Sequence, residues 1–411
     1  MNKADSERLE VALDQLGFSP SVTPDDANVI VLNSCVVRQQ SEDKVIGMLN
    51  TLRPLKESNP EKVVALMGCM VGPNVQMLEQ KFPQVDVFMR PQQYQPLINI
   101  IEDKYDVDID GCLNNLTGHP KIATFIPVIH GCDKFCTFCI IPYRRGRQRS
   151  VPIDEVVREA NLLVKRGVKE ITLLGQTVDA YGYDLPNKPD LADLLTSIND
   201  ICGLERIRFL TSHPNDMSDR IIDAIANLDK VCEHINLPFQ AGDDSILKNM
   251  RRGYTNKDYR ELVEKIRTTI PKVSLATDVI VGFSGESEEQ FHRTYELIKD
   301  IRFDKVHLAK YSTREGTIAS RKQPDDIPLQ EKKRRFKIIA ELQESIAEDI
   351  NKSYIGKIEE VLVDNSKNGV ECGRNRNDKL IYLQDDKNRL GELVEVQINE
   401  ISPWSLKGIT I

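Results

Sequence analysis

The sequence lacks long hydrophobic runs. No stretch approaches the roughly 18 to 20 apolar residues that a membrane-spanning helix needs, and the mean hydropathy is -0.37. The opening residues, MNKADSERLE, contain no apolar segment with a cleavage site of the kind that marks a secreted protein. These absences predict a cytoplasmic protein with no membrane association.

The cysteine content is ordinary, and basic residues are fewer than acidic ones. Nine cysteines among 411 residues are unevenly spread, and a disulfide framework of the secreted kind is not expected. The formal net charge is -8, from 55 Lys plus Arg against 63 Asp plus Glu, so the whole chain gives no sign of nucleic-acid binding. Local charge does, because Arg144, Arg145, Arg147 and Arg149 lie close together. A second basic run, residues 332–337, is interpreted as a solvated helix face.

Apolar segments alternate with helical patterns over residues 1–105. Strands such as NVIVLNSC and VVALMGC alternate with amphipathic helices at short spacing, which predicts a doubly wound parallel sheet. Cys35 and Cys69 each follow the carboxyl end of a buried strand. Because such strand ends face one crevice, the two thiols are expected to converge there.

The remaining chain divides into a linker and two further domains. Residues 106–121 show no period and are interpreted as a linker. Over residues 122–345, six β-α units predict an open (β/α)6 barrel of the TIM type, with the loops after its strands on one face. Short strands over residues 349–411 predict a small all-β barrel, of the size that binds single-stranded or looped nucleic acid.

Three cysteines form the pattern C-x-x-x-C-x-x-C at the end of the first barrel strand. They are Cys132, Cys136 and Cys139. A structural zinc site usually takes four ligands in paired knuckles, and no fourth ligand follows at suitable spacing. Three thiolates suit three irons of a four-iron, four-sulfur cluster and leave the fourth iron open to a substrate.

This pattern, with Phe138 just before the last cysteine, resembles that of the radical S-adenosylmethionine superfamily. Over the whole chain, the three-part organisation is similar to the methylthiotransferases of that superfamily, whose C-terminal barrel is of the TRAM type. Within them, the segments resemble the branch that adds a methylthio group to carbon 2 of a prenylated adenosine beside the tRNA anticodon. These segments are PYRRG, LLGQTVDAY, TSHP, LPFQAGDDSILKNMRRGYT, DVIVGFSGE and GRNRNDK.

The resemblance implies roles for particular residues. Cys132, Cys136 and Cys139 would hold the cluster whose open iron binds S-adenosylmethionine, and Arg144, Arg145 and Arg147 would contact the tRNA. Residues expected at S-adenosylmethionine are Phe138, Gly175, Gln176, Ser212, Gln240 and Gly282. Two alternatives stay open here, since Gly282 also suits a turn and Gln240 also suits a loop cap.

Cys35 and Cys69 match two of three cysteines that hold an auxiliary four-iron cluster in the family. The first of the three stands in a segment ending CQMN, whereas this sequence starts MN. We therefore expect that the front of the domain, with its cysteine, is absent through a late start site or truncation. With two protein ligands the auxiliary cluster is in doubt.

The implied partners are the tRNA anticodon stem-loop, an electron donor such as flavodoxin or ferredoxin, and a sulfur source. The chain itself is expected to act as a monomer. Radical chemistry suits carbon 2 of adenine because that carbon is unactivated. Related alternatives are methylthiolation of threonylcarbamoyladenosine in tRNA or of an aspartate in a ribosomal protein. A different class of alternative is a metal-stabilised RNA-binding protein without catalysis.

Overall fold

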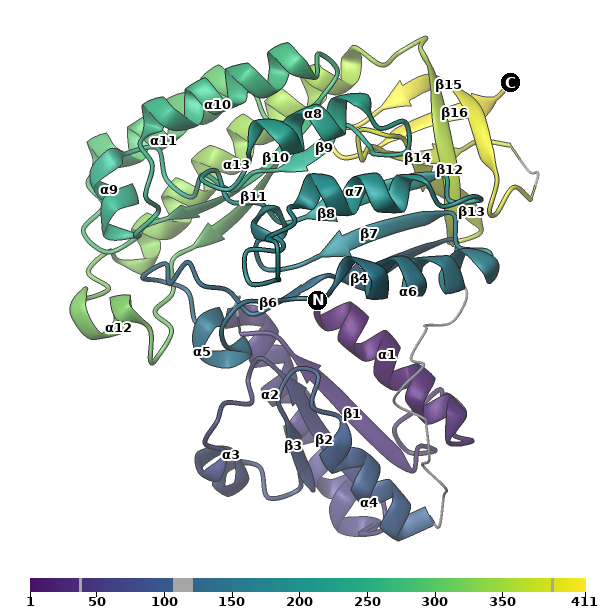
Figure 1. The fold of residues 1–411 in the computed structure, drawn as a ribbon. Helices are drawn as coiled ribbons and strands as arrows, with labels where there is room; N and C mark the ends of the chain where they lie inside the picture. The colour runs from purple at the N-terminus through teal and green to yellow at the C-terminus, as the bar shows by residue number, and fades with distance from the viewer. Residues whose placement is uncertain (37–38, 106–120, 386–387) are drawn as a thin grey trace. The chain divides into compact units, whose positions relative to one another are not determined.

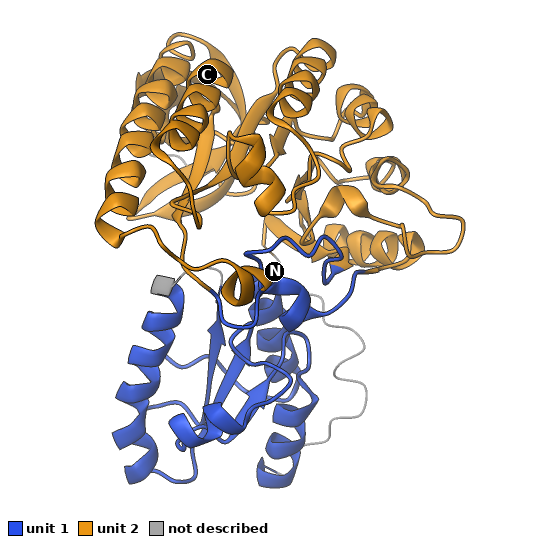
Figure 2. Cartoon of the chain, turned by 90° about the vertical axis from the view of Figure 1, so that its left-hand side faces the viewer, with its two compact units in different colours: residues 1–119, 130–148, 314–317 blue, residues 120–129, 149–313, 318–411 orange. Residues whose placement is uncertain are grey.

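The computed structural model describes residues 1–36, 39–105, 121–385 and 388–411. The chain forms two compact units, which Figure 2 colours separately. Unit 1 contains residues 1–119, 130–148 and 314–317, and unit 2 contains residues 120–129, 149–313 and 318–411. The predicted linker lies outside the described residues except for Lys121. None of the helices in the described ranges is long and apolar enough to cross a bilayer.

Unit 1 is built on a parallel sheet in the order β1-β2-β3 (Figure 1). Every residue of the central strand β2 is buried, as a strand covered on both faces requires. The predicted doubly wound sheet is therefore confirmed. Its elements are β1 (Val29–Ser34), β2 (Val63–Gly68), β3 (Val87–Met89), α1 (Asn2–Gln15), α2 (Gln39–Ser58), α3 (Gln76–Lys81), α4 (Gln95–Tyr105) and α5 (Ile141–Arg145).

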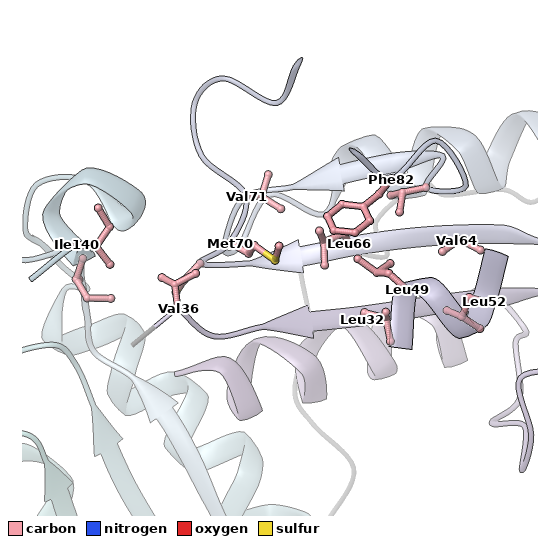
Figure 3. Close-up of a cluster of buried hydrophobic side chains, with 13 residues drawn as sticks. Leu32, Val36, Leu49, Leu52, Val64, Leu66, Met70, Val71, Phe82 and Ile140 are labelled. Carbon is pink, nitrogen blue, oxygen red and sulfur yellow. The ribbon is translucent and has the colours of Figure 1, made fainter. Parts of the chain in front are cut away.

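Alternate residues of β2 pack against different helices, because successive side chains of a strand point to opposite faces. Ala65 and Met67 pack with apolar residues of α1 and α4. Val64 and Leu66 pack with Leu49 of α2 on the other face, as Figure 3 shows.

Unit 2 begins with six parallel strands, in two sheets of order β4-β7-β8 and β9-β10-β11. The backbone N–H of Ser212 after β8 donates to the carbonyl of Asn236 in β9 at 3.1 Å, so the two sheets adjoin. This confirms the six β-α units. The strands are β4 (Ala123–Pro127), β7 (Glu170–Leu174), β8 (Arg206–Leu210), β9 (His234–Asn236), β10 (Ser274–Val281) and β11 (Lys305–Lys310).

The helices between these strands start at residues that satisfy their first backbone N–H groups. Asp190, Thr255 and Ser287 each form a capping box at the start of α7, α10 and α11, respectively. The helices and short elements here are α6 (Ile153–Lys165), η1 (Val178–Ala180), α7 (Leu191–Asn199), α8 (Asp219–Asn227), α9 (Asp244–Asn249), α10 (Asn256–Thr269), α11 (Glu288–Ile301) and α12 (Ile318–Lys322). The two-residue strands β5 (Ile129–His130) and β6 (Arg149–Ser150) flank the segment 131–148.

Helix α13 (Leu329–Lys352) carries the second basic run, and its interpretation as a solvated face is wrong for two residues. Lys332 and Arg335 are buried. Lys332 donates to the backbone carbonyl of Tyr311 at 3.0 Å, and Arg335 forms an ion pair with Glu286 at 2.7 Å. These buried charges fasten α13 to the barrel, which a charge count along the sequence does not reveal.

The C-terminal strands close into the predicted small barrel, in the order β12-β13-β14-β16-β15. The turn between β13 and β14 lies against the amino ends of the larger barrel's strands. Arg208 of β8 donates to the carbonyls of Asn375 and Arg376 in that turn, at 2.7 and 2.9 Å. The strands are β12 (Ile358–Lys367), β13 (Val370–Arg374), β14 (Leu380–Leu383), β15 (Leu393–Ile401) and β16 (Leu406–Thr410).

Candidate functional site

The three predicted cluster cysteines lie on one closed loop of unit 1, residues 132–139, which we call the three-cysteine loop. The backbone N–H of Cys132 donates to the carbonyl of Gly146 at 3.2 Å, and that of Cys139 donates to Cys136 at 3.0 Å. Gly131 has φ +71°, and a Cβ there would lie 2.1 Å from the carbonyl oxygen of Arg147. Glycine is required at position 131 because the backbone passes this closely.

The donor set on this loop fits an iron–sulfur cluster. All described cysteines are thiols rather than disulfides. Within the described ranges, no three His, Cys, Asp or Glu side chains converge closely enough to hold a single metal ion. A four-iron cluster instead spreads its thiolate ligands over separate irons, and three thiolates on one loop leave one iron open. Phe138 is half-buried immediately before Cys139, and its role at S-adenosylmethionine stays a prediction.

The other two predicted ligands lie at the carboxyl ends of β1 and β2, as expected for strand ends of a parallel sheet. The backbone N–H of Cys69 donates to the carbonyl of Ser34 at 3.0 Å, next to Cys35. Burial raises the pKa of the Cys69 thiol, while the nearby Arg145 guanidinium lowers it. The side-chain oxygen of Asn2 in α1 lies 3.8 Å from the Cys69 sulfur, and the Asn2 amide donates to the carbonyl of Ser34, next to Cys35, at 2.7 Å. The amino-terminal end of α1 therefore lies beside both cysteines.

One apolar cluster of unit 1 links the two sets of cysteines. It contains Cys69 together with Ile140 and Ile141 of the segment after the three-cysteine loop, and Cys132 and Cys139 pack against it. Figure 3 shows Ile140 at one end of this cluster and the β2 side chains within it. Packing of this kind fixes the segment around the three-cysteine loop against the end of the N-terminal sheet.

Among the three predicted tRNA-binding arginines, Arg147 is exposed and Arg144 is half-buried. The Arg147 side chain is 74% exposed and forms an ion pair with Asp133 at 2.7 Å, and its guanidinium lies 5.6 Å from the centre of the Phe135 ring. Arg144 is half-buried over Gly72, where a Cβ would lie 1.9 Å from its Nη1 atom. Their contact with tRNA stays a prediction.

Arg145 does not fit that prediction. Its side chain is 4% exposed and forms an ion pair at 2.9 Å with Asp5, which is 1% exposed. Arg145 ends the short helix α5, whereas the exposed Arg147 lies beyond the helix, after Gly146. The sequence pattern RRGR does not distinguish an inward from an outward arginine.

The remaining predicted residues lie at the carboxyl ends of barrel strands in unit 2. Gly175 and Gln176 follow β7, Ser212 follows β8 and Gly282 follows β10. Gln240 follows β9 with φ +68°, an uncommon conformation for a residue other than glycine that is often found at functional sites.

One of these positions, Ser212, has a feature that suits a bound ligand. The Ser212 hydroxyl oxygen is buried and has no hydrogen-bond partner within the described parts of the chain. Buried polar atoms are rarely left unsatisfied. This fits the amino acid and ribose groups of S-adenosylmethionine. A Cβ at Gly175 would lie 2.9 Å from a methyl carbon of Val178, so the protein itself fills the space beside this glycine, and a role at S-adenosylmethionine stays a prediction.

Asn236 was not predicted from the sequence. It ends β9, and its buried side-chain oxygen has no hydrogen-bond partner in the ranges that the structure covers. Its side-chain amide donates to Asp278 of β10 at 3.3 Å. The available signal was its position at the end of the strand HIN, beside the predicted Gln240.

Gly282 is held by neighbours that explain its identity. Its N–H donates to a carboxylate oxygen of Glu286 at 2.7 Å, and its φ is +71°. A Cβ there would lie 2.4 Å from a carbon of Lys332. The turn interpretation of Gly282 thus has direct support, while a role at S-adenosylmethionine stays a prediction.

Comparison with known proteins agrees with this arrangement. Residues 126–298 match the radical SAM superfamily, residues 1–90 match the uncharacterized protein family UPF0004, and residues 352–411 match the TRAM domain. A tRNA-2-methylthio-N6-dimethylallyladenosine synthase from Dehalococcoides mccartyi (strain CBDB1) is 46% identical over 99% of this chain and 95% of its own length. The protein of the same name from Roseiflexus sp. (strain RS-1) is 46% identical over 100% and 87%.

The chain belongs to the family of these synthases. As a member of the radical SAM superfamily, it is expected to use a four-iron, four-sulfur cluster and S-adenosylmethionine. The three-part organisation that the sequence suggested agrees with the three family matches, although the predicted domain limits of 1–105, 122–345 and 349–411 stay predictions. The two compact units are a different division of the chain.

Solved structures support the fold. A radical S-adenosylmethionine methyltransferase, TsrM from Kitasatospora setae, with cobalamin and a [4Fe-4S] cluster bound, has a TM-score of 0.55 at 14% identity. The match covers 77% of this chain and 73% of the TsrM chain. The cobalamin-dependent radical enzyme OxsB has a TM-score of 0.52 at 11% identity, covering 82% and 52%. At these identities the likeness concerns the fold alone.

Proposed function

We propose that this chain adds a methylthio group to carbon 2 of N6-prenylated adenosine next to the anticodon of tRNA. The observation that carries the proposal is full-length similarity, at 46% identity, to relatives named for this reaction. The three-cysteine loop of unit 1 and the ligand-ready strand ends of unit 2 support it.

Each part of the chain has its own task in the proposed reaction. Cys132, Cys136 and Cys139 bind the radical cluster, and the Ser212 hydroxyl and the side-chain oxygen of Asn236 hold polar groups of S-adenosylmethionine. When bound, the cluster and S-adenosylmethionine supply the one-electron chemistry that an unactivated carbon–hydrogen bond requires. The chain itself binds and orients these groups.

Cys35 and Cys69 are proposed ligands of a second four-iron cluster that supplies the sulfur. Their position at two adjacent strand ends, near the three-cysteine loop within unit 1, supports this role. An electron donor such as flavodoxin or ferredoxin and a separate sulfur source complete the reaction. We further propose that the chain acts as a monomer in the cytoplasm.

Arg144 and Arg147 are proposed to contact the phosphates of the anticodon stem-loop. The bases of such a loop lie outside a regular duplex, so the target adenosine can reach a site without the cost of opening base pairs. Local positive charge of this kind explains how a chain of net charge -8 can bind RNA.

The test is mass spectrometry of tRNA nucleosides from a bacterial strain that lacks its own enzyme and expresses this chain. We expect methylthiolated prenyl-adenosine, and none from the Cys136→Ala variant. Methylthiolated threonylcarbamoyladenosine, or a methylthiolated ribosomal protein, would instead assign the chain to a related reaction. A soluble, iron-loaded chain that yields no methylthio product and does not cleave S-adenosylmethionine would support the RNA-binding alternative.

A further inference from the structure

Two arginines lie close together at the carboxyl edge of the sheet in unit 1. Arg90 directly follows β3, and Arg144 belongs to α5. Nη2 of Arg90 donates to the backbone carbonyl of Arg144 at 3.1 Å. The carboxyl ends of parallel strands form the edge at which ligands usually bind such a sheet. Arg90 was not predicted from the sequence, and it lies where this rule expects a ligand.

A glycine makes room for the guanidinium of Arg144. A Cβ at Gly72, in the segment after β2, would lie 1.9 Å from Nη1 of Arg144 and 3.2 Å from its Cζ atom. Gly72 is not among the glycines with positive φ, so its backbone conformation does not require a glycine. The space that the guanidinium occupies does require one.

Neither guanidinium has a counter-ion among the residues that the structure describes. The neighbouring Arg145 pairs with Asp5 at 2.9 Å, whereas no carboxylate of the described ranges forms an ion pair with Arg90 or Arg144. The Nε atoms of Arg90 and Arg144 are buried and lack a hydrogen-bond partner in the same ranges. Burying an N–H group of a charged side chain is costly unless the group is paired. The two arginines thus lack an anion that the described protein does not provide.

We propose that Arg90 and Arg144 together bind one phosphate group of the tRNA. A guanidinium presents its N–H donors as a planar fork that matches two oxygens of a phosphate. Because Arg90 reaches the backbone of Arg144, one phosphate can contact both side chains. The inference rests on the proposed function, which supplies the tRNA. It adds Arg90, and a single shared phosphate, to the contact proposed for Arg144.

The test measures the affinity of the full chain, loaded with iron and sulfide, for a labelled anticodon stem-loop RNA. Fluorescence anisotropy at several salt concentrations compares Arg90→Gln, Arg144→Gln and the double variant R90Q/R144Q with the parent chain. Each single variant is expected to bind about tenfold more weakly. A purely structural role would reduce the fraction of active protein without changing the slope of log affinity against log salt.

The double variant decides whether one phosphate is shared. If it is, the loss in R90Q/R144Q is smaller than the product of the two single losses, and the salt slope falls by about one. Losses that multiply, with a salt slope that falls by about two, would mean that each arginine binds its own phosphate and would overturn the shared site.

Gly72→Ala tests the geometry without changing any charge. The new methyl group takes the place of Nη1 of Arg144, which ends a flexible side chain, so Arg144 moves away and the chain still folds. RNA affinity is expected to fall about as far as in Arg144→Gln. Arg53→Gln on α2 is the matched control, because Arg53 is 59% exposed and pairs with Glu57. It should change neither the affinity nor the salt slope.

Unchanged RNA affinity and salt slope in the arginine variants and in Gly72→Ala would overturn the inference. Inorganic phosphate and adenosine 5′-monophosphate test a different source of the phosphate. If either compound protects the parent chain from thermal unfolding but not R90Q/R144Q, while RNA affinity is the same in both, the site binds a free phosphate compound and the tRNA assignment is overturned.

The nucleoside assay decides the proposed function separately. Methylthiolated prenyl-adenosine from the parent chain, with no effect of the variants on RNA binding, would leave the proposed function standing and remove the phosphate site. No methylthiolated nucleoside, with RNA binding weakened in the variants as expected, would overturn the proposed function and support the phosphate site.

Discussion

Arg145 of unit 1 and Arg208 of unit 2 are both buried beside a carboxylate, and they differ in what else they contact. Arg208 pairs with Glu170 at 3.0 Å and donates to two backbone carbonyls of the β13–β14 turn. Arg145 pairs with Asp5 and contacts side chains next to Cys69. Arg208 therefore joins the large and small barrels of unit 2, whereas Arg145 joins α1 to the segment after the three-cysteine loop.

The same contrast holds for the two ends of the six-stranded barrel. At the amino ends of the strands, Arg376 from the C-terminal barrel pairs with Glu233 at 2.8 Å, and Lys379 pairs with Asp304 at 2.8 Å. At the carboxyl ends, Ser212 and Asn236 retain buried oxygens without hydrogen-bond partners among the described residues. The ion pairs lie at the end that is closed by protein, where the Nε atom of Arg206 also lacks a hydrogen-bond partner among the described residues. At the other end, the two unpaired oxygens can form hydrogen bonds with a ligand.

The largest effect is expected from one thiol of the three-cysteine loop. Cys136→Ala removes a cluster ligand, so methylthiolated nucleoside should fall to background. The matched control is Cys232→Ala in unit 2, a buried thiol whose pKa is raised by burial and which has no proposed ligand role. Nucleoside mass spectrometry compares the two. Equal loss in both would mean that either substitution acts through folding.

The next effect tests the structural assignment of Arg208. Its side chain is 6% exposed and that of Glu170 is 8% exposed. Arg208→Met leaves this carboxylate buried without its partner, which should lower the free energy of unfolding by about 3 to 5 kcal/mol. Denaturant unfolding measures the loss.

A change at an exposed ion pair is the control for that loss. Arg158→Met on α6 disrupts a pair whose side chains are 66% and 76% exposed, and should change the free energy of unfolding by less than about 1 kcal/mol. If Arg208→Met proves as mild as this, the amino ends of the barrel strands are not held by that pair.

Sequence periodicity and cysteine spacing predicted much of the fold and the positions of several site residues. The alternation of strands and helices predicted the parallel sheet and the six β-α units, because burial on both faces leaves a continuous apolar run such as VVALMG. The C-x-x-x-C-x-x-C spacing predicted one loop with three thiols, since ligands close in sequence need no tertiary fold to come together. Strand ends predicted where polar residues gather in unit 2.

Contacts between distant residues could not be predicted in the same way. Arg145 and Asp5 lie 140 positions apart in the sequence, and nothing in RRGR indicates which arginine turns inward. Lys332 and Arg335 were expected in solvent for the same reason, because their partners Tyr311 and Glu286 belong to distant turns. A charged side chain is buried in an ion pair only where the fold brings a partner residue next to it.

The closed end of the barrel should also show in the pH dependence of stability. Burial lowers the pKa of His234 to about 4, although Asp378, 3.9 Å away, opposes the shift. The unfolded chain binds a proton near pH 6.5 and the folded chain near pH 4, so stability rises with pH between these values. As the pH falls from about 6.5 to 4, about 3 kcal/mol should be lost.

Thermal or denaturant unfolding at several pH values measures this loss. His234→Gln should flatten the dependence in that window. His292→Gln is the control, because His292 is 66% exposed on α11, and it should retain the full dependence. A flat profile in the parent chain would contradict a neutral, buried His234.

The smallest effect is expected from a substitution at the carboxyl ends of the barrel strands, where we propose that S-adenosylmethionine binds. Ser212→Ala removes a buried hydroxyl that has no hydrogen-bond partner in the described structure, so the free energy of unfolding should stay equal or rise slightly. If that hydroxyl binds S-adenosylmethionine, its loss should raise the dissociation constant about tenfold, the equivalent of about 1.4 kcal/mol. Anaerobic calorimetry on the cluster-loaded chain measures the affinity.

Stability and affinity thus move in different senses for Ser212→Ala, which separates a ligand contact from a packing defect. The control is Ser353→Ala, whose hydroxyl already donates to the carbonyl of Ile350 at 2.7 Å and should not affect the affinity. Reduced stability with unchanged affinity would make Ser212 a residue of the fold. The carboxyl ends would then resemble the amino ends, and the contrast between the two ends of the barrel would rest on Asn236 alone.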